Sequence, residues 1–281
     1  MHPSGTDNLI EALIQLLQEE DERLEIVRQK LIEIGAPARP LLQKSAAKGT
    51  PVISERAGQI LESIRLEEMD REWQAYVRKE SCPLEEGIFL LARFGDSRLD
   101  IEYYHQKLDE MAEILQARLE SNPLPEETIE ILNQYLFKEL KFSGNKLQYY
   151  LPENSYIHNL LDLKKGIPIS LSVLMLLLAE RLRLPLHGVG MPGHFLVKWA
   201  EAGREIYIDP FNLGQILSRD EIASYLSEGG MTWKDEYLET VSSRQIIARM
   251  IRNLIHIYKQ EGEVEKEVWL ERFYEWVRLS F

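Results

Sequence analysis

Apolar residues recur every three or four positions along the start of the chain. The spacing over 9–17 predicts an amphipathic helix, and the spacing over 24–34 predicts a second. Shorter helices are expected over 41–47 and 52–66, since glycine and proline interrupt the pattern between them. We therefore expect a segment made of helices over residues 1–80.

Helical spacing continues from residue 81 to residue 140. A helix is expected around 88–94, a long helix over 103–119 and another over 129–140. Ser81 followed by Pro83 has the residue types of a helix N-cap and a first helical turn. This part of the chain is expected to add helices to those of residues 1–80.

The pattern changes after residue 142. Short helices are predicted over 157–163 and 219–227, and a strongly apolar helix over 169–183 is expected to be buried on most sides. Three segments with strand-like patterns follow the apolar helix: 186–191, 194–199 and 205–208. Gly203 lies at the turn between the last two, which predicts a small antiparallel sheet.

Helical spacing returns in the last forty residues, around 246–258 and 268–276. The expected fold class is α+β and mostly α, with a small antiparallel sheet flanked by helical-repeat segments. The chain is expected to have three parts: a helical segment over 1–80, an α+β domain over 81–240 and a helical hairpin over 241–281.

Charge and composition narrow the classes of partner. The 281-residue chain has 33 Lys and Arg against 46 Asp and Glu, a formal net charge of −13. That balance argues against nucleic acid and anionic membrane surfaces, which both attract clustered basic residues. The most apolar stretch, 167–178, is too short to span a bilayer, which takes about 20 residues. With one cysteine and no signal-peptide pattern, the chain is expected to be soluble and cytoplasmic.

The predicted elements of residues 166–210 come in this order: loop, buried helix, strand, strand beginning with His194, and strand ending with Asp209. A transglutaminase-like or papain-like site requires this order. There, a nucleophile stands at the N-terminus of the helix, where the dipole favours a thiolate. A histidine acts as base and an aspartate orients it. Pairing of the last two strands is expected to bring His194 and Asp209 together.

Six short strings stand out along the chain: PLEE (83–86), NSY (154–156), KGIPISL (165–171), LP (184–185), GVGMPGHFL (188–196) and DPF (209–211). Together they resemble the SirB1 family, from about residue 80 onward. The resemblance implies a transglutaminase-like (papain-like) core followed by tetratricopeptide-like helices. Residues 26–42 separately resemble a HEAT-type helical repeat, with an ordinary helical bundle as the alternative.

Active transglutaminase-like enzymes carry Gly-x-Cys at the start of the central helix, and this chain departs from that pattern. Matching Gly166 places the Cys position on Pro168, which has no nucleophile and suits a first helical turn. Ser170 is the candidate replacement, ahead of Ser172, although such a serine also suits a cap or a backbone hydrogen bond. Cys82 precedes a different helix and is expected to be a packed thiol.

Five residues are expected to shape a groove beside His194: Asn154, Ser155, Gly166, Pro168 and Gly193. The Asn-Ser pair also suits a turn with a helix cap. His187 is expected to be structural. The chain has no zinc motif, phosphate loop or dinucleotide fingerprint, so we expect neither a metal nor a cofactor.

Three functions stay open at this point. The first is a non-catalytic transglutaminase-like protein that binds a protein or peptide partner, favoured by the absent Cys and the flanking repeats. The second is an acyl-transfer or amide-hydrolysing enzyme that uses Ser170, His194 and Asp209. The third is a structural scaffold in which the cleft is filled.

Overall fold

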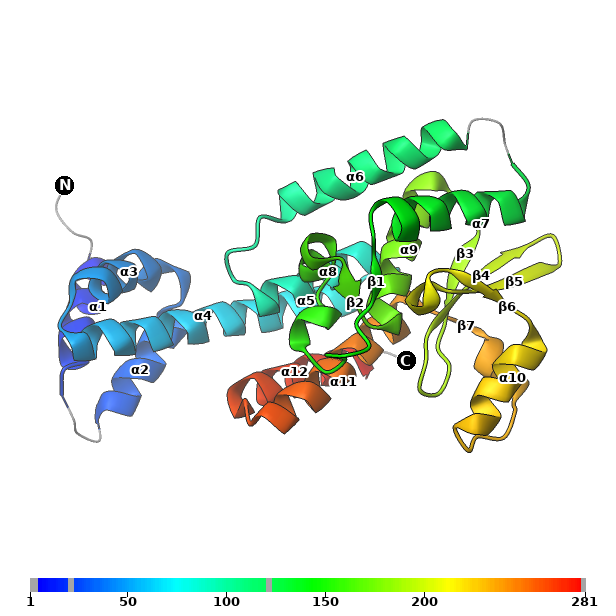
Figure 1. Cartoon of the computed structure of the whole chain (residues 1–281). Coiled ribbons are helices and arrows are strands. Elements are labelled where there is room, and N and C mark those ends of the chain that lie inside the picture. The colour runs from blue at the N-terminus through cyan, green and yellow to red at the C-terminus, as the bar shows by residue number, and fades with distance from the viewer. Residues whose placement is uncertain (1–4, 20–22, 120–122, 279–281) are drawn as a thin grey trace. The chain divides into compact units, whose positions relative to one another are not determined.

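The computed structural model describes residues 5–19, 23–119 and 123–278. The chain divides into two compact units, Met1–Glu72 and Trp73–Phe281 (Figure 1). The division falls inside helix α4 (Pro51–Val77). Helices dominate the described residues and the larger sheet is antiparallel, which confirms the predicted α+β, mostly α fold class.

The first unit is helical, as the sequence predicts. Its elements are α1 (Gly5–Leu16), α2 (Arg23–Ile34), the 3-10 turn η1 (Ala36–Ala38), α3 (Arg39–Lys48) and the first part of α4. Gly35 follows α2 with a φ of 67°, a conformation that glycine adopts without strain. The apolar stripes of the helices meet in one core, where Ile10, Leu31, Leu42 and Ile60 are fully buried.

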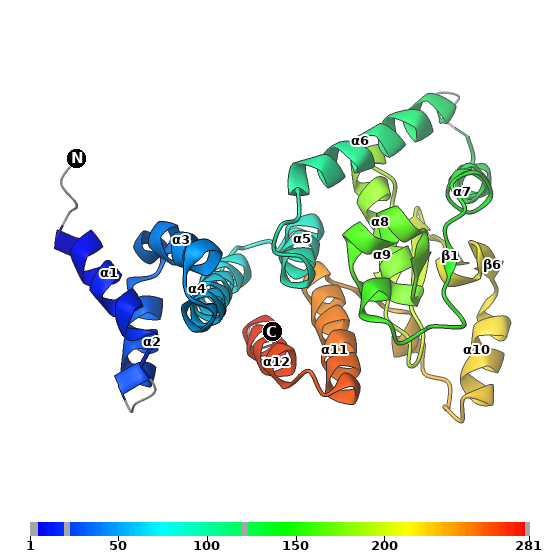
Figure 2. The same ribbon diagram turned by 60° about the vertical axis from the view of Figure 1, so that its left-hand side comes forward.

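The second unit is built around its most apolar helix. Its helices are α5 (Leu84–Gly95), α6 (Ile101–Arg118), α7 (Pro125–Asn133), α8 (Ile157–Leu163), α9 (Pro168–Leu182), α10 (Arg219–Glu228), α11 (Ser243–Glu261) and α12 (Val264–Arg278). Every residue of α9 from Pro168 to Ala179 is buried. Helices α6, α8 and α11 all pack against it (Figure 2).

A five-stranded antiparallel sheet completes this unit. Its strands are β3 (Leu186–Val189), β4 (Leu196–Glu201), β5 (Arg204–Asp209), β6 (Gln215–Leu217) and β7 (Thr240–Val241), in the order β6-β5-β4-β3-β7. Leu196 and Tyr207 share an apolar cluster with Ile222 and Leu226 of α10. Alternate residues of β4 and β5 point to the opposite face, and α9 packs against β3 and β4. The sheet therefore lies between two helices.

Several elements differ from the sequence prediction. Strand β3 ends at Val189 and β4 begins at Leu196, so His194 lies in the connecting loop and not on a strand. Pro192 in that loop has no amide N–H for a ladder hydrogen bond, which explains the interruption. The predicted helix over 129–140 is α-helical only to the end of α7. It continues as a π-helical segment, η2 (Gln134–Glu139).

The shortest strands were not predicted. Strands β6 and β7 and the two-residue parallel pair β1 (Ser143–Gly144) and β2 (Lys165–Gly166) are too short to show an alternating pattern.

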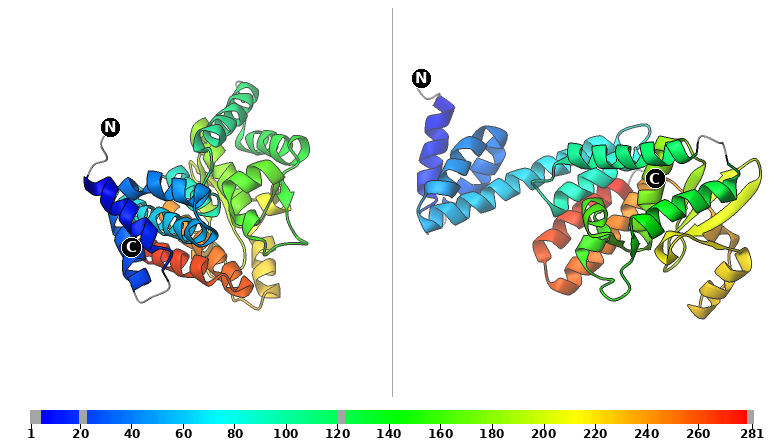
Figure 3. Two further views of the ribbon diagram at one scale, coloured as in Figure 1. Left: turned by 90° about the vertical axis from the view of Figure 1, so that its left-hand side faces the viewer. Right: turned by 45° about the horizontal axis from the view of Figure 1, so that its top comes forward.

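The C-terminal helices belong to the second unit. Helices α11 and α12 lie side by side (Figure 3), and α11 also packs on α5 and α9. Trp73 and Phe273 stack with ring centroids 5.8 Å apart, which adds the end of α4 to the same core. Among the helices of the described residues, none is both long and apolar enough to cross a membrane.

Candidate functional site

The β4–β5 hairpin positions the two residues that the sequence singled out. Val197 pairs with Ile208, so the start of β4 lies beside the end of β5. His194 precedes β4 by two residues and Asp209 ends β5. Their side chains meet, with His194 Nε2 2.8 Å from Asp209 Oδ2, and both residues are buried.

Asp209 is held as an ionised acceptor. Its Oδ1 accepts the backbone N–H groups of Phe211 and Asn212, the last two residues of the 3-10 turn η4 (Pro210–Asn212). Its Oδ2 also accepts the Asn212 amide. Burial alone would raise the pKa of Asp209. The hydrogen bond and charge of His194, with the Asn212 contacts, outweigh burial and leave the pKa below its ordinary value. Because a carboxylate only accepts, His194 Nε2 carries the proton.

The other ring nitrogen of His194, Nδ1, has no hydrogen-bond partner within the ranges 5–19, 23–119 and 123–278. The histidine instead borders an open cavity of about 480 Å³, here called the His194 pocket. The residues that line it are Tyr149, Pro168, Ile169, Gly190, Met191, Pro192, Gly193, His194, Phe195, Tyr237, Arg249, Arg252 and Asn253. An aspartate-oriented histidine thus borders a space that could hold a ligand.

The start of α9 contributes proline to this pocket. Pro168 takes the first helical position, where its missing N–H costs no hydrogen bond. Ser170 is fully buried, and its hydroxyl lies 2.6 Å from the Asn154 carbonyl oxygen while accepting the Ile167 N–H at 3.0 Å. The structure therefore places Pro168 in the pocket and uses the Ser170 hydroxyl to cap the helix, away from the pocket lining.

The five predicted groove residues separate into two groups. Pro168 and Gly193 line the His194 pocket. Asn154 and Ser155 are buried in the 3-10 turn η3 (Pro152–Ser155), and the Asn154 amide donates to the carbonyls of Gln148 and Tyr149. Asn154 thereby fixes the loop that carries Tyr149 into the pocket.

Gly166 precedes α9 by two residues and is not among the residues that line the His194 pocket. A Cβ atom there would stand 2.7 Å from Ser170 Oγ, so glycine permits the cap to form.

Sequence analysis missed the wall of the pocket that α11 supplies. Arg249 donates from Nη2 to the His194 carbonyl oxygen at 2.8 Å, and its guanidinium carbon lies 5.5 Å from the Phe195 ring centroid. Burial lowers the pKa of Arg249, and the nearby Arg252 charge adds to that effect. The available signal was an arginine beside the buried stripe of α11, three residues after Ile246.

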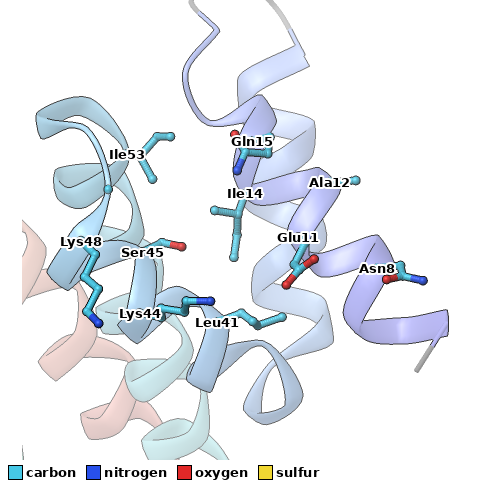
Figure 4. A pocket seen from close by; sticks show the side chains of 11 residues that line it. Asn8, Glu11, Ala12, Ile14, Gln15, Leu41, Lys44, Ser45, Lys48 and Ile53 are labelled. Atoms are coloured by element: carbon cyan, nitrogen blue, oxygen red, sulfur yellow. The ribbon is translucent and has the colours of Figure 1, made fainter. Parts of the chain in front are cut away.

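Other candidate groups lie elsewhere. Cys82 is half-buried, with its Sγ 3.0 Å from Arg244 Nη2, and borders a different cavity together with the exposed His187. The first unit has its own open pocket of about 580 Å³ between α1 and α3, where Glu11 and Lys44 lie on opposite walls (Figure 4). No group of three or more His, Cys, Asp or Glu residues within the described ranges could hold a metal ion.

The fold and the oriented His–Asp pair agree with the sequence comparisons. Residues 102–252 match the profile of the transglutaminase-like superfamily, and the chain belongs to that superfamily. The UPF0162 protein of Xylella fastidiosa (strain 9a5c) is 35% identical over 190 residues, which cover 66% of this chain and 68% of the relative. F-box only protein 21 of Homo sapiens is 34% identical over 164 residues, covering 56% of this chain and 25% of the relative. No solved structure matches the chain.

Proposed function

We propose that the chain is a non-catalytic transglutaminase-like protein that binds a peptide segment of a partner in the His194 pocket. One observation carries the proposal: the pocket keeps the His194–Asp209 pair but has Pro168 at the helix start. Its described lining contains no Ser, Thr, Cys or Lys. A base without a nucleophile beside it supports binding over covalent chemistry.

Tyr149 in the pocket lining does not change this conclusion. Tyrosine can act as a nucleophile when its hydroxyl is deprotonated. Burial raises the pKa of Tyr149, and the neighbouring Tyr150 adds to the effect, so the phenol stays protonated near neutral pH. Tyr149 is therefore expected to contribute a contact surface and a hydrogen bond.

The composition of the pocket suits a peptide. Aromatic residues and arginine are enriched where proteins bind partners, and Tyr149, Tyr237, Phe195, Arg249 and Arg252 together form much of this lining. The loop that brings Tyr149 to the pocket also exposes Leu147 (98%) and Tyr150 (59%) to solvent. These neighbours extend the apolar surface that a bound segment could cover.

Selection of displayed random peptides on the full chain tests the proposal. Enriched peptides should bind the Asn253→Trp variant at least about tenfold more weakly, because an indole side chain would fill the pocket. The matched control is Gln260→Trp, an exposed position on the same helix outside the pocket lining, which should bind normally. Bound peptides should also keep their mass after prolonged incubation.

Two results would contradict the proposal: absence of any enriched peptide, or equal weakening by the two tryptophan variants. A change in peptide mass that disappears in His194→Ala would instead establish the catalytic alternative. The intact His194–Asp209 pair is the observation that favours an enzyme. Catalysis would also need the Ser170 hydroxyl to leave the Asn154 carbonyl oxygen and to reach His194.

The family, the repeat types, the location and the kind of partner are part of the same proposal. We place the chain in the SirB1 family, with a HEAT-like first unit and a tetratricopeptide-like hairpin formed by α11 and α12. The apolar core shared by α1–α4 and the close packing of α11 on α12 support these assignments. The proposal also includes a cytoplasmic location and a protein partner, with neither nucleic acid nor membrane as ligand, in line with the acidic net charge of −13.

A further inference from the structure

Two arginines on one helix give the His194 pocket a positive wall. Arg249 and Arg252 lie three residues apart on α11 and both line the pocket. They are near enough that the charge of Arg252 lowers the pKa of Arg249. Two like charges on one helix face destabilise each other, and half-burial of Arg249 strengthens the repulsion because the local dielectric falls.

Neither arginine has a carboxylate partner in the described parts of the chain. Seven other arginines of the described residues do form ion pairs with Asp or Glu. The carboxylate of the His194–Asp209 pair already accepts hydrogen bonds from His194 and from η4. One hydrogen bond of Arg249, to the His194 carbonyl, leaves most of its five N–H donors available.

We infer that the His194 pocket binds an oxyanion, either a carboxylate or a phosphate, carried by the peptide ligand and held between Arg249 and Arg252. A guanidinium presents its donors as a planar fork that matches both anions. Asn253 lines the same pocket, and its side-chain amide offers a neutral donor for such an anion. The inference rests on the proposed function for the peptide that carries the anion, whereas the anion site can be tested alone.

The test uses succinate, inorganic phosphate and uncharged succinamide at constant ionic strength, so that screening does not change. NMR signals of the arginine Nε–H groups report binding. Succinate or phosphate should shift the Arg249 and Arg252 signals to saturation, and succinamide should not. Arg252→Gln should weaken binding about tenfold or more, as expected for loss of charged hydrogen bonds. Since Arg252 is exposed, this variant should fold normally.

Arg98→Gln is the matched control, because it removes the same charge from an exposed position outside the pocket. Equal weakening by Arg98→Gln, or no saturable shift with either anion, would overturn the inference. The stronger of the two anions identifies the source: succinate points to an acidic side chain or C-terminus, and phosphate to a phosphorylated residue.

The two proposals fail separately. If selected peptides depend on Asn253 but bind Arg252→Gln and Arg249→Lys normally, the peptide function stands and the oxyanion site is wrong. If succinate or phosphate binds at the arginines while no peptide is ever enriched, the oxyanion site stands and the peptide function is wrong.

Discussion

At the residue scale, Asp209 satisfies four donors at once: His194 Nε2, two backbone N–H groups and the Asn212 amide. These donors stabilise the ionised carboxylate more than burial disfavours it, so its pKa in the folded chain is lowered. The carboxylate in turn fixes the orientation and the tautomer of His194. One side chain therefore links the start of η4, the end of β5 and the pocket.

Asp209→Asn should destabilise the chain by about 2 kcal/mol near neutral pH, the typical worth of hydrogen bonds to a charged group. The lowered pKa sets the sign of the pH dependence. Between that pKa and the ordinary value of about 3.9, the unfolded chain binds more protons, so Asp209 stabilises the fold above this range and loses the effect as pH falls through it. Urea unfolding near pH 7 and near pH 3 should show the difference shrink.

Asp220→Asn serves as the control for that experiment, because this exposed side chain lies on α10 outside the His194 pocket. It should change the free energy of unfolding by less than about 0.5 kcal/mol. A deficit of Asp209→Asn that persists unchanged in acid would show that the ionised carboxylate is not the source of the stability.

At the scale of helices and strands, the sequence predicted the elements that have a long hydrophobic pattern or a turn between neighbouring segments. The apolar run of α9 and the alternation around Gly203 are sufficient to identify a buried helix and a hairpin. The hairpin also explains why the His194–Asp209 contact could be anticipated. The contact of Arg249 with His194 could not be anticipated. The two residues are 55 positions apart in the chain, and only tertiary packing brings them together.

The start of α9 depends on its serine cap. Ser170→Ala should cost about 1–3 kcal/mol, since the Ile167 N–H and the Asn154 carbonyl oxygen would both lose a buried partner. Ser172→Ala is the matched control on the same helix. Ser172 is equally buried, but its only described partner, the Phe195 carbonyl oxygen, is 3.5 Å away, so a smaller loss is expected. Urea unfolding compares the two; equal losses would contradict the capping role.

At the scale of the whole molecule, the first unit has its own apolar core. The buried members of that core all lie between Ile10 and Ile64. Leu31→Ala should therefore destabilise the first unit by about 2–5 kcal/mol, through lost packing and a cavity. Hydrogen exchange should accelerate in α1–α3 and stay unchanged in α9.

Leu177→Ala, at an equally buried position of α9, should give the opposite pattern. If Leu31→Ala instead lowers the protection of α9 as much as that of α2, the two units unfold as one cooperative body.

The sequence separation between Arg249 and His194 also sets the order in which the site can form during synthesis. His194 and Asp209 leave the ribosome close together, and the hairpin that joins them makes a local contact. Arg249 follows Asp209 by 40 residues, a delay of roughly 2 to 8 seconds at about 5–20 residues per second. The imidazole and its aspartate can thus pair before the arginines leave the ribosome, and the nascent pocket acquires its positive charge last.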